Sequence, residues 1–164
     1  MLLPSFIELV KSPVQLLALG FGSGLAPKAP GTFGTLAAIP FYFLFFDYSF
    51  SAQLLIILFT FILGVYLCQA TADALGVHDH PAIVWDEFVG FWLTMLPLAL
   101  LGIQLEWYWL LLGFVLFRFF DIVKPWPIRF VDRKVSGGFG IMFDDILAGL
   151  YAGAILFVII KYIG

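Results

Sequence analysis

The sequence is poor in charge. Of its 164 residues, 12% are Asp, Glu, Lys or Arg, whereas a soluble domain carries about 25%. Hydrophobic residues make up 63% of the chain, and the mean hydropathy is +1.07. The formal net charge of −3 offers no general attraction to nucleic acid. These values exclude an ordinary soluble domain and predict an integral membrane protein with a single domain, residues 1–164.

Several features typical of other functions are missing. The single cysteine, Cys68, excludes an internal disulfide and lies in an apolar run, where a small side chain facing lipid or the core is its simplest role. The first residues show no basic region followed by a small-residue cleavage site, so we expect no cleaved signal peptide. No GxxxxGK[ST] motif or dinucleotide fingerprint is present, and no serine or cysteine lies in a nucleophile motif. Covalent catalysis by serine or cysteine is therefore not expected.

Long intervals without charge predict the membrane-spanning helices. Residues 48–72 and 88–105 are each long enough to cross an apolar layer of about 30 Å as a helix. The intervals 107–117 and 146–160 are shorter, so their helices must extend into the neighbouring charged residues. A further helix is expected from about Thr32, as its cap, to about Phe46, with a kink at Pro40.

The prediction is therefore an all-α fold: a small integral membrane helical bundle of about five spans. The segment Ser5–Leu19 is expected to form an additional N-terminal interfacial helix. With five spans, seven of the eight Lys and Arg residues fall on one side of the membrane. The positive-inside rule places that side, with the N-terminus and the polar loops 20–35, 73–87 and 118–145, in the cytoplasm.

The most charged stretch is FRFFDIVKPWPIRFVDRK at 117–134, which holds five of the eight basic residues. Such a patch is costly in a membrane and indicates a site that handles a charged group at the membrane surface. Arg118, Asp121 and Lys124 follow one another at three-residue spacing and share a helical face. A simple Arg118–Asp121 ion pair is the alternative interpretation. Pro125 and Pro127 are expected to end this helix.

Five carboxylates lie at the ends of the apolar runs, on the predicted cytoplasmic face. This number of oxygen ligands suits Mg²⁺, which could polarise a phosphoryl oxygen or activate a water. Acidic residues in the first turn of a helix also stabilise the helix dipole, and this alone could explain two of them. It does not explain Asp121, which lies at a C-terminal helix end. The five carboxylates are Asp86, Glu87, Asp121, Asp144 and Asp145.

Three further signals are weaker. The Gly- and Pro-rich stretch 20–35 predicts a loop whose backbone amides and Lys28 could hold an anion, or else a plain turn. The residues 78–80, His-Asp-His, are too few ligands for a zinc site, and a polar surface loop is the simpler interpretation. Gly149 and Gly153 form a GxxxG pattern that would allow close helix packing.

Four blocks carry a resemblance to a known family. They are GFGSGLAPKAPGTFGTLAAIP at 20–40, GVHDHPAIVWDEFVGFW at 76–92, FRFFDIVKPWPIRFVDR at 117–133 and GGFGIMFDDILAG at 137–149. In the same order, over about residues 15–155, they closely resemble the phosphatidylglycerophosphatase A family of the bacterial inner membrane. The resemblance implies a Mg²⁺-dependent lipid phosphatase. Its reaction would convert phosphatidylglycerophosphate to phosphatidylglycerol and inorganic phosphate, with the site facing the cytoplasm.

The resemblance also implies the site residues. We expect the five carboxylates to hold one or two Mg²⁺ ions, and the basic residues to offset charge on the phosphoryl oxygens. Attack by water and an aspartyl-phosphate on Asp144 or Asp145 both remain open. Arg129 is a further phosphate candidate, although membrane orientation or headgroup contact explains it equally well. The candidates are Asp86, Glu87, Asp121, Asp144 and Asp145 for metal binding and catalysis, and Lys28, Arg118, Lys124 and Arg129 for phosphate.

Two other functions compete with this one. A CDP-alcohol type phosphotransferase would also gather acids at the cytoplasmic surface, but its pattern is absent, because Asp144 and Asp145 are adjacent and no Asp-Gly follows them. A small channel or transporter would place ionisable residues through the depth of the membrane. Here they gather near one surface, so a lipid phosphatase is the favoured hypothesis.

Overall fold

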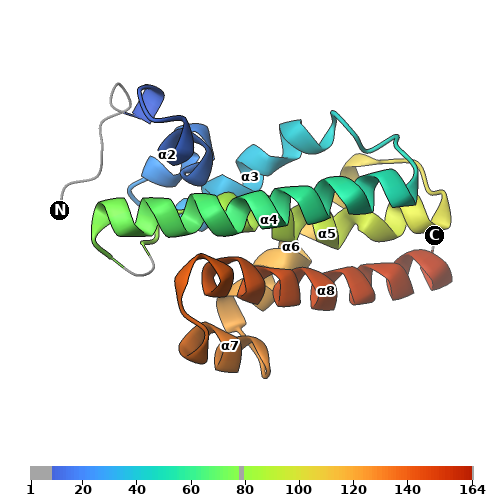
Figure 1. The fold of residues 1–164 in the computed structure, drawn as a ribbon. Helices are drawn as coiled ribbons and strands as arrows, with labels where there is room; N and C mark the ends of the chain where they lie inside the picture. The colour runs from blue at the N-terminus through green and yellow to red at the C-terminus, as the bar shows by residue number, and fades with distance from the viewer. Residues whose placement is uncertain (1–8, 78–79, 164) are drawn as a thin grey trace.

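The computed structural model describes residues 9–77 and 80–163. Within them the chain is entirely helical, as predicted (Figure 1). His78, Asp79 and the first part of the expected interfacial helix Ser5–Leu19 lie outside the described residues. The elements in order are α2 (Pro13–Ala18), the 3₁₀ helix η1 (Gly20–Leu25), α3 (Pro30–Tyr42), α4 (Phe50–Leu75), α5 (Trp85–Leu101), α6 (Trp107–Val123), α7 (Ile128–Lys134) and α8 (Gly137–Ile163).

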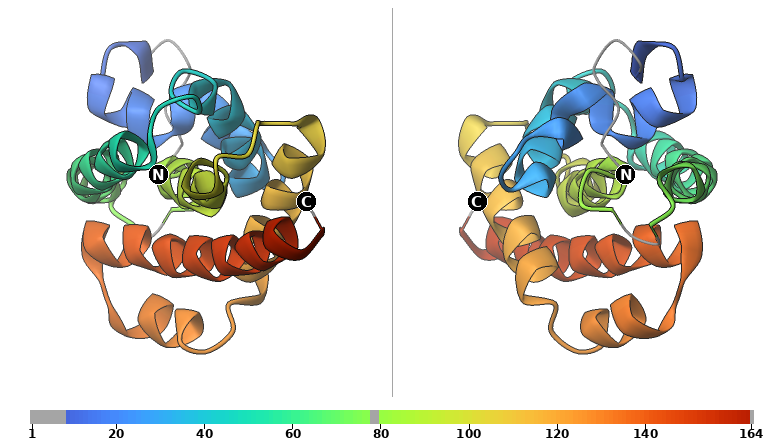
Figure 2. Two further views of the ribbon diagram at one scale, coloured as in Figure 1. Left: turned by 90° about the vertical axis from the view of Figure 1, so that its right-hand side faces the viewer. Right: turned by 90° about the vertical axis from the view of Figure 1, so that its left-hand side faces the viewer.

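Helix α5 forms the centre of the bundle. It packs against α3, α4, α6 and α8 (Figure 2), and most of its side chains are buried. The indole of Trp85 donates a hydrogen bond to the carbonyl of Thr60 in α4, and the indole of Trp92 donates one to the carbonyl of Ala38 in α3. These two bonds satisfy the indole N–H groups that α5 buries against its neighbours, as burial requires. Every helix that contributes to the site described below contacts this central helix.

The ends of the long helices follow local sequence signals. The hydroxyl of Ser49 accepts a hydrogen bond from the amide of Ala52 and caps α4, and Gly76 ends this helix with a positive φ. Helix α6 runs through Arg118 and Asp121 and ends at Val123, with Lys124 as its C-cap just before Pro125. Both the extension of α6 into the charged stretch and its termination were predicted from the sequence.

The start of α3 differs from the prediction. The helix begins at Pro30 rather than at Thr32, and it ends at Tyr42 rather than near Phe46. Proline is favoured in the first helical turn because its φ is already helical and its missing N–H is not needed there. Residues 30–35, expected to be part of a loop, are therefore the first turns of α3. A glycine is needed in this part of α3 because the helix packs closely against Val84. A Cβ on Gly34 would lie 2.6 Å from the Cβ of Val84.

Two of the described helices, α4 and α8, are long and apolar enough to cross a membrane. The core helix of a soluble protein can pass the same test, but such a helix is mostly buried. Helix α4 instead exposes a broad apolar surface that includes Leu55, Leu58, Phe59 and Ile62. An exposed apolar face of this size indicates association with a membrane.

Helices α5 and α8 approach each other closely at one point. A Cβ added to Gly149 of α8 would lie 2.6 Å from the carbonyl oxygen of Gly90 in α5, and a Cβ on Gly90 would lie 2.9 Å from the carbonyl oxygen of Asp145. The GxxxG pattern therefore does permit close packing, as predicted, but through its first glycine. At Gly153 an added Cβ would find only ordinary contacts, from 3.5 Å.

Candidate active site

A charged pocket of about 310 Å³ opens at one end of the bundle. Its walls come from α5, α6 and α8 and from the first residues of α3. Seven of the nine site residues predicted from the sequence line it. These seven are Asp86, Glu87, Arg118, Asp121, Lys124, Asp144 and Asp145.

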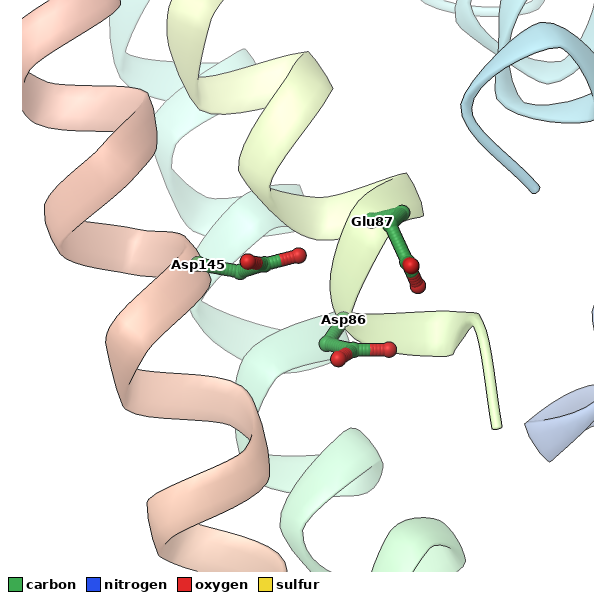
Figure 3. A group of neighbouring side chains, drawn as sticks. All are labelled: Asp86, Glu87 and Asp145. Carbon is green, nitrogen blue, oxygen red and sulfur yellow. The ribbon is translucent and has the colours of Figure 1, made fainter. Parts of the chain in front are cut away.

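Three of the carboxylates form a tight group. Asp86 and Glu87 project from the first turn of α5, and Asp145 reaches toward them from α8 (Figure 3). One oxygen of each lies within 4.8 Å of the others. At this separation two full charges repel each other by at least about 3 kcal/mol with an effective dielectric constant of 20. The group is therefore a strong attractor for positive charge.

Two buried oxygens of this group lack a hydrogen-bond donor among the described residues. They are Oε2 of Glu87 and Oδ2 of Asp145. Leaving buried carboxylate oxygens unsatisfied costs about 1–3 kcal/mol each or more. A divalent cation coordinated by oxygen would remove both this cost and the mutual repulsion, so the donor set fits Mg²⁺.

Arg118 of α6 faces the same group. Its Nη1 lies 2.7 Å from Oδ2 of Asp121 and 3.7 Å from Oε1 of Glu87. The same nitrogen also donates to the hydroxyl of Thr35 in α3, at 3.5 Å. The Arg118–Asp121 ion pair proposed as the simpler alternative is therefore present. This ion pair leaves one donor of the guanidinium without a partner, because Nε of Arg118 is buried and finds no acceptor among the described residues.

Lys124 links the pocket to α7. Its ammonium donates to Oδ2 of Asp144 and to Oδ1 of Asp132, each at 2.6 Å. Burial alone would lower the pKa of Lys124, but the charges of Asp144 and Asp132 and these two hydrogen bonds outweigh burial and raise that pKa. Lys124 is therefore a fixed positive charge in the pocket wall. Sequence reasoning did not identify Asp132 as its second partner.

The two remaining candidates lie outside the pocket lining. Lys28 is exposed and stands just before Ala29, Pro30 and Gly31, which form part of the pocket rim. Arg129 is also exposed, but it lies on α7, in a separate groove. The chain leaves α6 at Lys124, and Arg129 follows on α7, which is a separate helix.

Gly31 is a site residue that sequence reasoning did not single out. A Cβ at this position would collide with Oε1 of Glu87, and it would lie 3.0 and 3.1 Å from the terminal nitrogens of Arg118. The absence of a side chain thus lets α3 approach the Glu87–Arg118 contact. In the sequence, the pair Pro30-Gly31 indicates a helix start. It does not indicate that Gly31 would lie against Glu87 and Arg118.

A glutamine at the end of α4 positions the start of α8. Oε1 of Gln69 accepts a hydrogen bond of 2.7 Å from the amide of Gly138, and Nε2 donates to Asp73 at 2.8 Å. A helix start leaves several amides without partners in the helix, and this side chain satisfies one of them. Gln69 thereby helps to fix the helix that carries Asp144 and Asp145.

The fold and the site define a class: a helical, membrane-associated protein with a buried charged pocket at one end of its bundle. The family model for phosphatidylglycerophosphatase A matches residues 16–160 of the chain. Phosphatidylglycerophosphatase A of Escherichia coli (strain K12) is 50% identical over 150 residues, which cover 92% of this chain and 85% of that relative. The chain belongs to the phosphatidylglycerophosphatase A family, and it is an enzyme, a phosphatase.

Two further relatives extend the comparison. Phosphatidylglycerophosphatase A of Haemophilus influenzae is 48% identical over 151 residues, covering 90% of this chain and 89% of the relative. A protein of Bacteroides thetaiotaomicron named putative phosphatidylinositol-3-phosphatase is 42% identical over 156 residues, covering 91% of each chain. No solved structure matches this chain.

Proposed function

We propose that this enzyme hydrolyses the terminal phosphomonoester of phosphatidylglycerophosphate and releases phosphatidylglycerol and inorganic phosphate, a step of phospholipid biosynthesis. Two relatives that match most of the chain carry the name of this activity. The observation that supports it best is the convergence of five carboxylates and two bases on one pocket in an otherwise apolar chain. A site of this kind suits a phosphate group bound together with a cation.

Mg²⁺ is the cofactor that we propose for this pocket. Asp86, Glu87 and Asp145 would hold it, since one oxygen of each lies close to the others and buried oxygens of Glu87 and Asp145 lack a hydrogen-bond donor among the described residues. Asp121 and Asp144 line the same pocket and complete the set of carboxylates. When bound, the ion supplies positive charge that polarises a phosphoryl oxygen.

The basic residues of the pocket provide the contacts to phosphate. The guanidinium of Arg118 can turn donors toward phosphoryl oxygens, and its planar fork matches the geometry of phosphate. The ammonium of Lys124 adds a fixed charge beside Asp144. Lys28, next to the rim, is proposed to meet the phosphate as it enters. Together these charges would stabilise the negative charge that develops on the phosphoryl group.

We further propose that α3, α4, α5, α6 and α8 make five membrane spans, with α2 at the interface. The charged pocket would then face the cytoplasm, in the bacterial inner membrane. The apolar lengths of α4 and α8 support this arrangement directly. Helices α5 and α6 have 17 residues each and α3 has 13, so these three would need their adjoining turns, or a tilt, to match the bilayer.

The test is phosphate release from phosphatidylglycerophosphate by purified full-length protein in detergent. We expect release with Mg²⁺, none with EDTA, and recovery when Mg²⁺ is restored. Asp121→Asn should lower the rate by about 100-fold or more, because it removes one charge of the site and the partner of Arg118.

The matched control is Asp47→Asn, an exposed carboxylate outside the pocket, which should retain the rate of the unchanged protein. Release unaffected by EDTA would contradict the role of the metal ion. Full activity in Asp121→Asn would contradict the site. No release by folded protein supplied with Mg²⁺ would contradict the reaction itself.

A further inference from the structure

A second charged surface lies beside the pocket and is formed by the end of α6 and by α7. It is a groove of about 490 Å³, here called the α7 groove. Four bases and two aromatic residues dominate its lining: Lys124, Arg129, Arg133 and Lys134, with Trp126 and Phe130. The pocket is mainly acidic, whereas the α7 groove is basic.

The positive charge of the α7 groove is largely uncompensated. Arg129, Arg133 and Lys134 are exposed, and none of them forms an ion pair with another described residue. The nearby acid, Asp132, is already bonded to Lys124. Three cations on a seven-residue helix repel one another, so this surface favours an anionic ligand.

The aromatic residues give the same surface an apolar component. Trp126 is 80% exposed and Phe130 is 57% exposed. Helix α7 attaches to α8 through the buried side chains of Ile128 and Val131, and it lies on the opposite side of α8 from α5 (Figure 2). Exposed aromatic side chains mixed with Arg and Lys are typical of the boundary between lipid tails and headgroups. An anion that suits the α7 groove is therefore one attached to a lipid.

The α7 groove and the acidic pocket are neighbours, because Lys124 lines both. Its ammonium bonds to Asp144 of the pocket and to Asp132 of α7. An elongated ligand could therefore contact both, with Lys124 between its two ends. The proposed substrate has this form, since it carries a terminal phosphomonoester and, one glycerol unit away, a phosphodiester that bears the acyl chains.

We propose that the α7 groove binds the phosphodiester of the substrate while the acidic pocket holds the terminal phosphomonoester. This inference rests on the proposed function. Arg129 and Arg133 lie one helical turn apart, on the same face of α7, and guanidinium groups match phosphate geometry. The groove would select lipids with two phosphates over lipids with only a terminal phosphomonoester. The phosphodiester itself is bound and not cleaved.

The test compares two lipids in neutral detergent micelles, using the full-length protein and the double variant Arg129→Gln/Arg133→Gln. One lipid is phosphatidylglycerophosphate. The other is phosphatidic acid, which has the phosphomonoester but no phosphodiester, measured through its KM or, if it is not turned over, through its inhibition constant. Loss of two exposed charge contacts should weaken the apparent affinity for phosphatidylglycerophosphate by about tenfold. The affinity for phosphatidic acid should change far less, so the discrimination between the two lipids falls.

The control is Lys161→Gln, which removes an exposed base near the far end of α8. It should leave the discrimination unchanged. Equal weakening for both lipids in the double variant would overturn the proposal and assign the bases to general attraction of anionic lipid. Unchanged affinity for phosphatidylglycerophosphate would overturn it as well.

A binding measurement separates this proposal from the proposed function. Native mass spectrometry of the same proteins reports bound phosphatidylglycerophosphate whether or not phosphate is released. If the unchanged protein releases no phosphate, the proposed reaction fails, and weaker lipid binding by the double variant would still support the α7 groove. Equal binding by both proteins would refute it.

Discussion

The contact between Gly90 and Gly149 provides the sharpest test of how packing forms the site. In Gly149→Ala the new methyl group would lie 2.6 Å from the carbonyl oxygen of Gly90, where ordinary contact begins near 3.4 Å. Because the obstacle is backbone, α5 and α8 must move apart by about 0.8 Å, or bend. Overpacking of this kind costs about 1–3 kcal/mol. Asp145, one turn before Gly149, would then move away from Asp86 and Glu87.

The matched control is Gly153→Ala, four residues further along α8, where the added methyl finds its nearest atoms at 3.5 Å. Both changes raise helix propensity by a similar amount, so their difference isolates the packing effect. We expect Gly149→Ala to have a melting temperature about 2–12 °C below that of Gly153→Ala in detergent. Its phosphate release should fall by up to about 100-fold, the cost of a displacement near 1 Å in a catalytic group.

Both quantities can be measured on one preparation, by thermal unfolding followed with near-ultraviolet circular dichroism and by an assay for released phosphate. Equal melting temperatures and equal activities of the two variants would refute the reasoning, because close approach at Gly149 would then not be needed to assemble the carboxylates. If Gly149→Ala were less stable but fully active, the close packing at Gly149 would stabilise the fold without positioning the carboxylates. The predicted loss of phosphate release would then be refuted.

Two further changes test other walls of the pocket. Gly31→Ala places a methyl group against Glu87 and Arg118. Phosphate release should fall about tenfold or more, with little change in melting temperature. Activity equal to that of the unchanged protein would contradict the contact. Lys124→Met leaves the buried Asp144 without its cation, whereas Asp132→Asn keeps the Lys124–Asp144 pair. Lys124→Met should therefore have the lower melting temperature of the two. The reverse order would contradict the assigned partners.

The helices could be predicted from the sequence because their signals are local. The extension of α6 through Arg118 and Asp121 followed from the short charge-free interval, and its end followed from Pro125. The start of α3 was wrong by two residues, since the hydroxyl of Thr32 was expected as the cap, whereas Pro30 begins the helix. The number of membrane spans stays a prediction, because only α4 and α8 have the required length and hydropathy on their own.

The membership of the pocket was largely predictable, but its internal arrangement was not. The positions of the charged residues between the apolar runs indicated that they gather near one surface, and seven of the nine candidates do line one pocket. Which carboxylate faces which partner depends on the rotation of each helix about its axis. Packing sets that rotation, for example the contact between Gly90 and Gly149. The position of Arg129 in the α7 groove likewise depends on the turn at Lys124 and on how α7 docks on α8.

The adjacent pair Asp144 and Asp145 shows why this rotation matters. Consecutive residues on a helix point about 100° apart, because a turn contains 3.6 residues. Asp145 therefore faces α5 and joins Asp86 and Glu87, whereas Asp144 faces the turn after α6 and pairs with Lys124. One helix thus contributes one carboxylate to the acidic group and the next to the ion pair with Lys124. With the proposed Mg²⁺ bound, a phosphate in the pocket would meet positive charge from the ion and from Lys124.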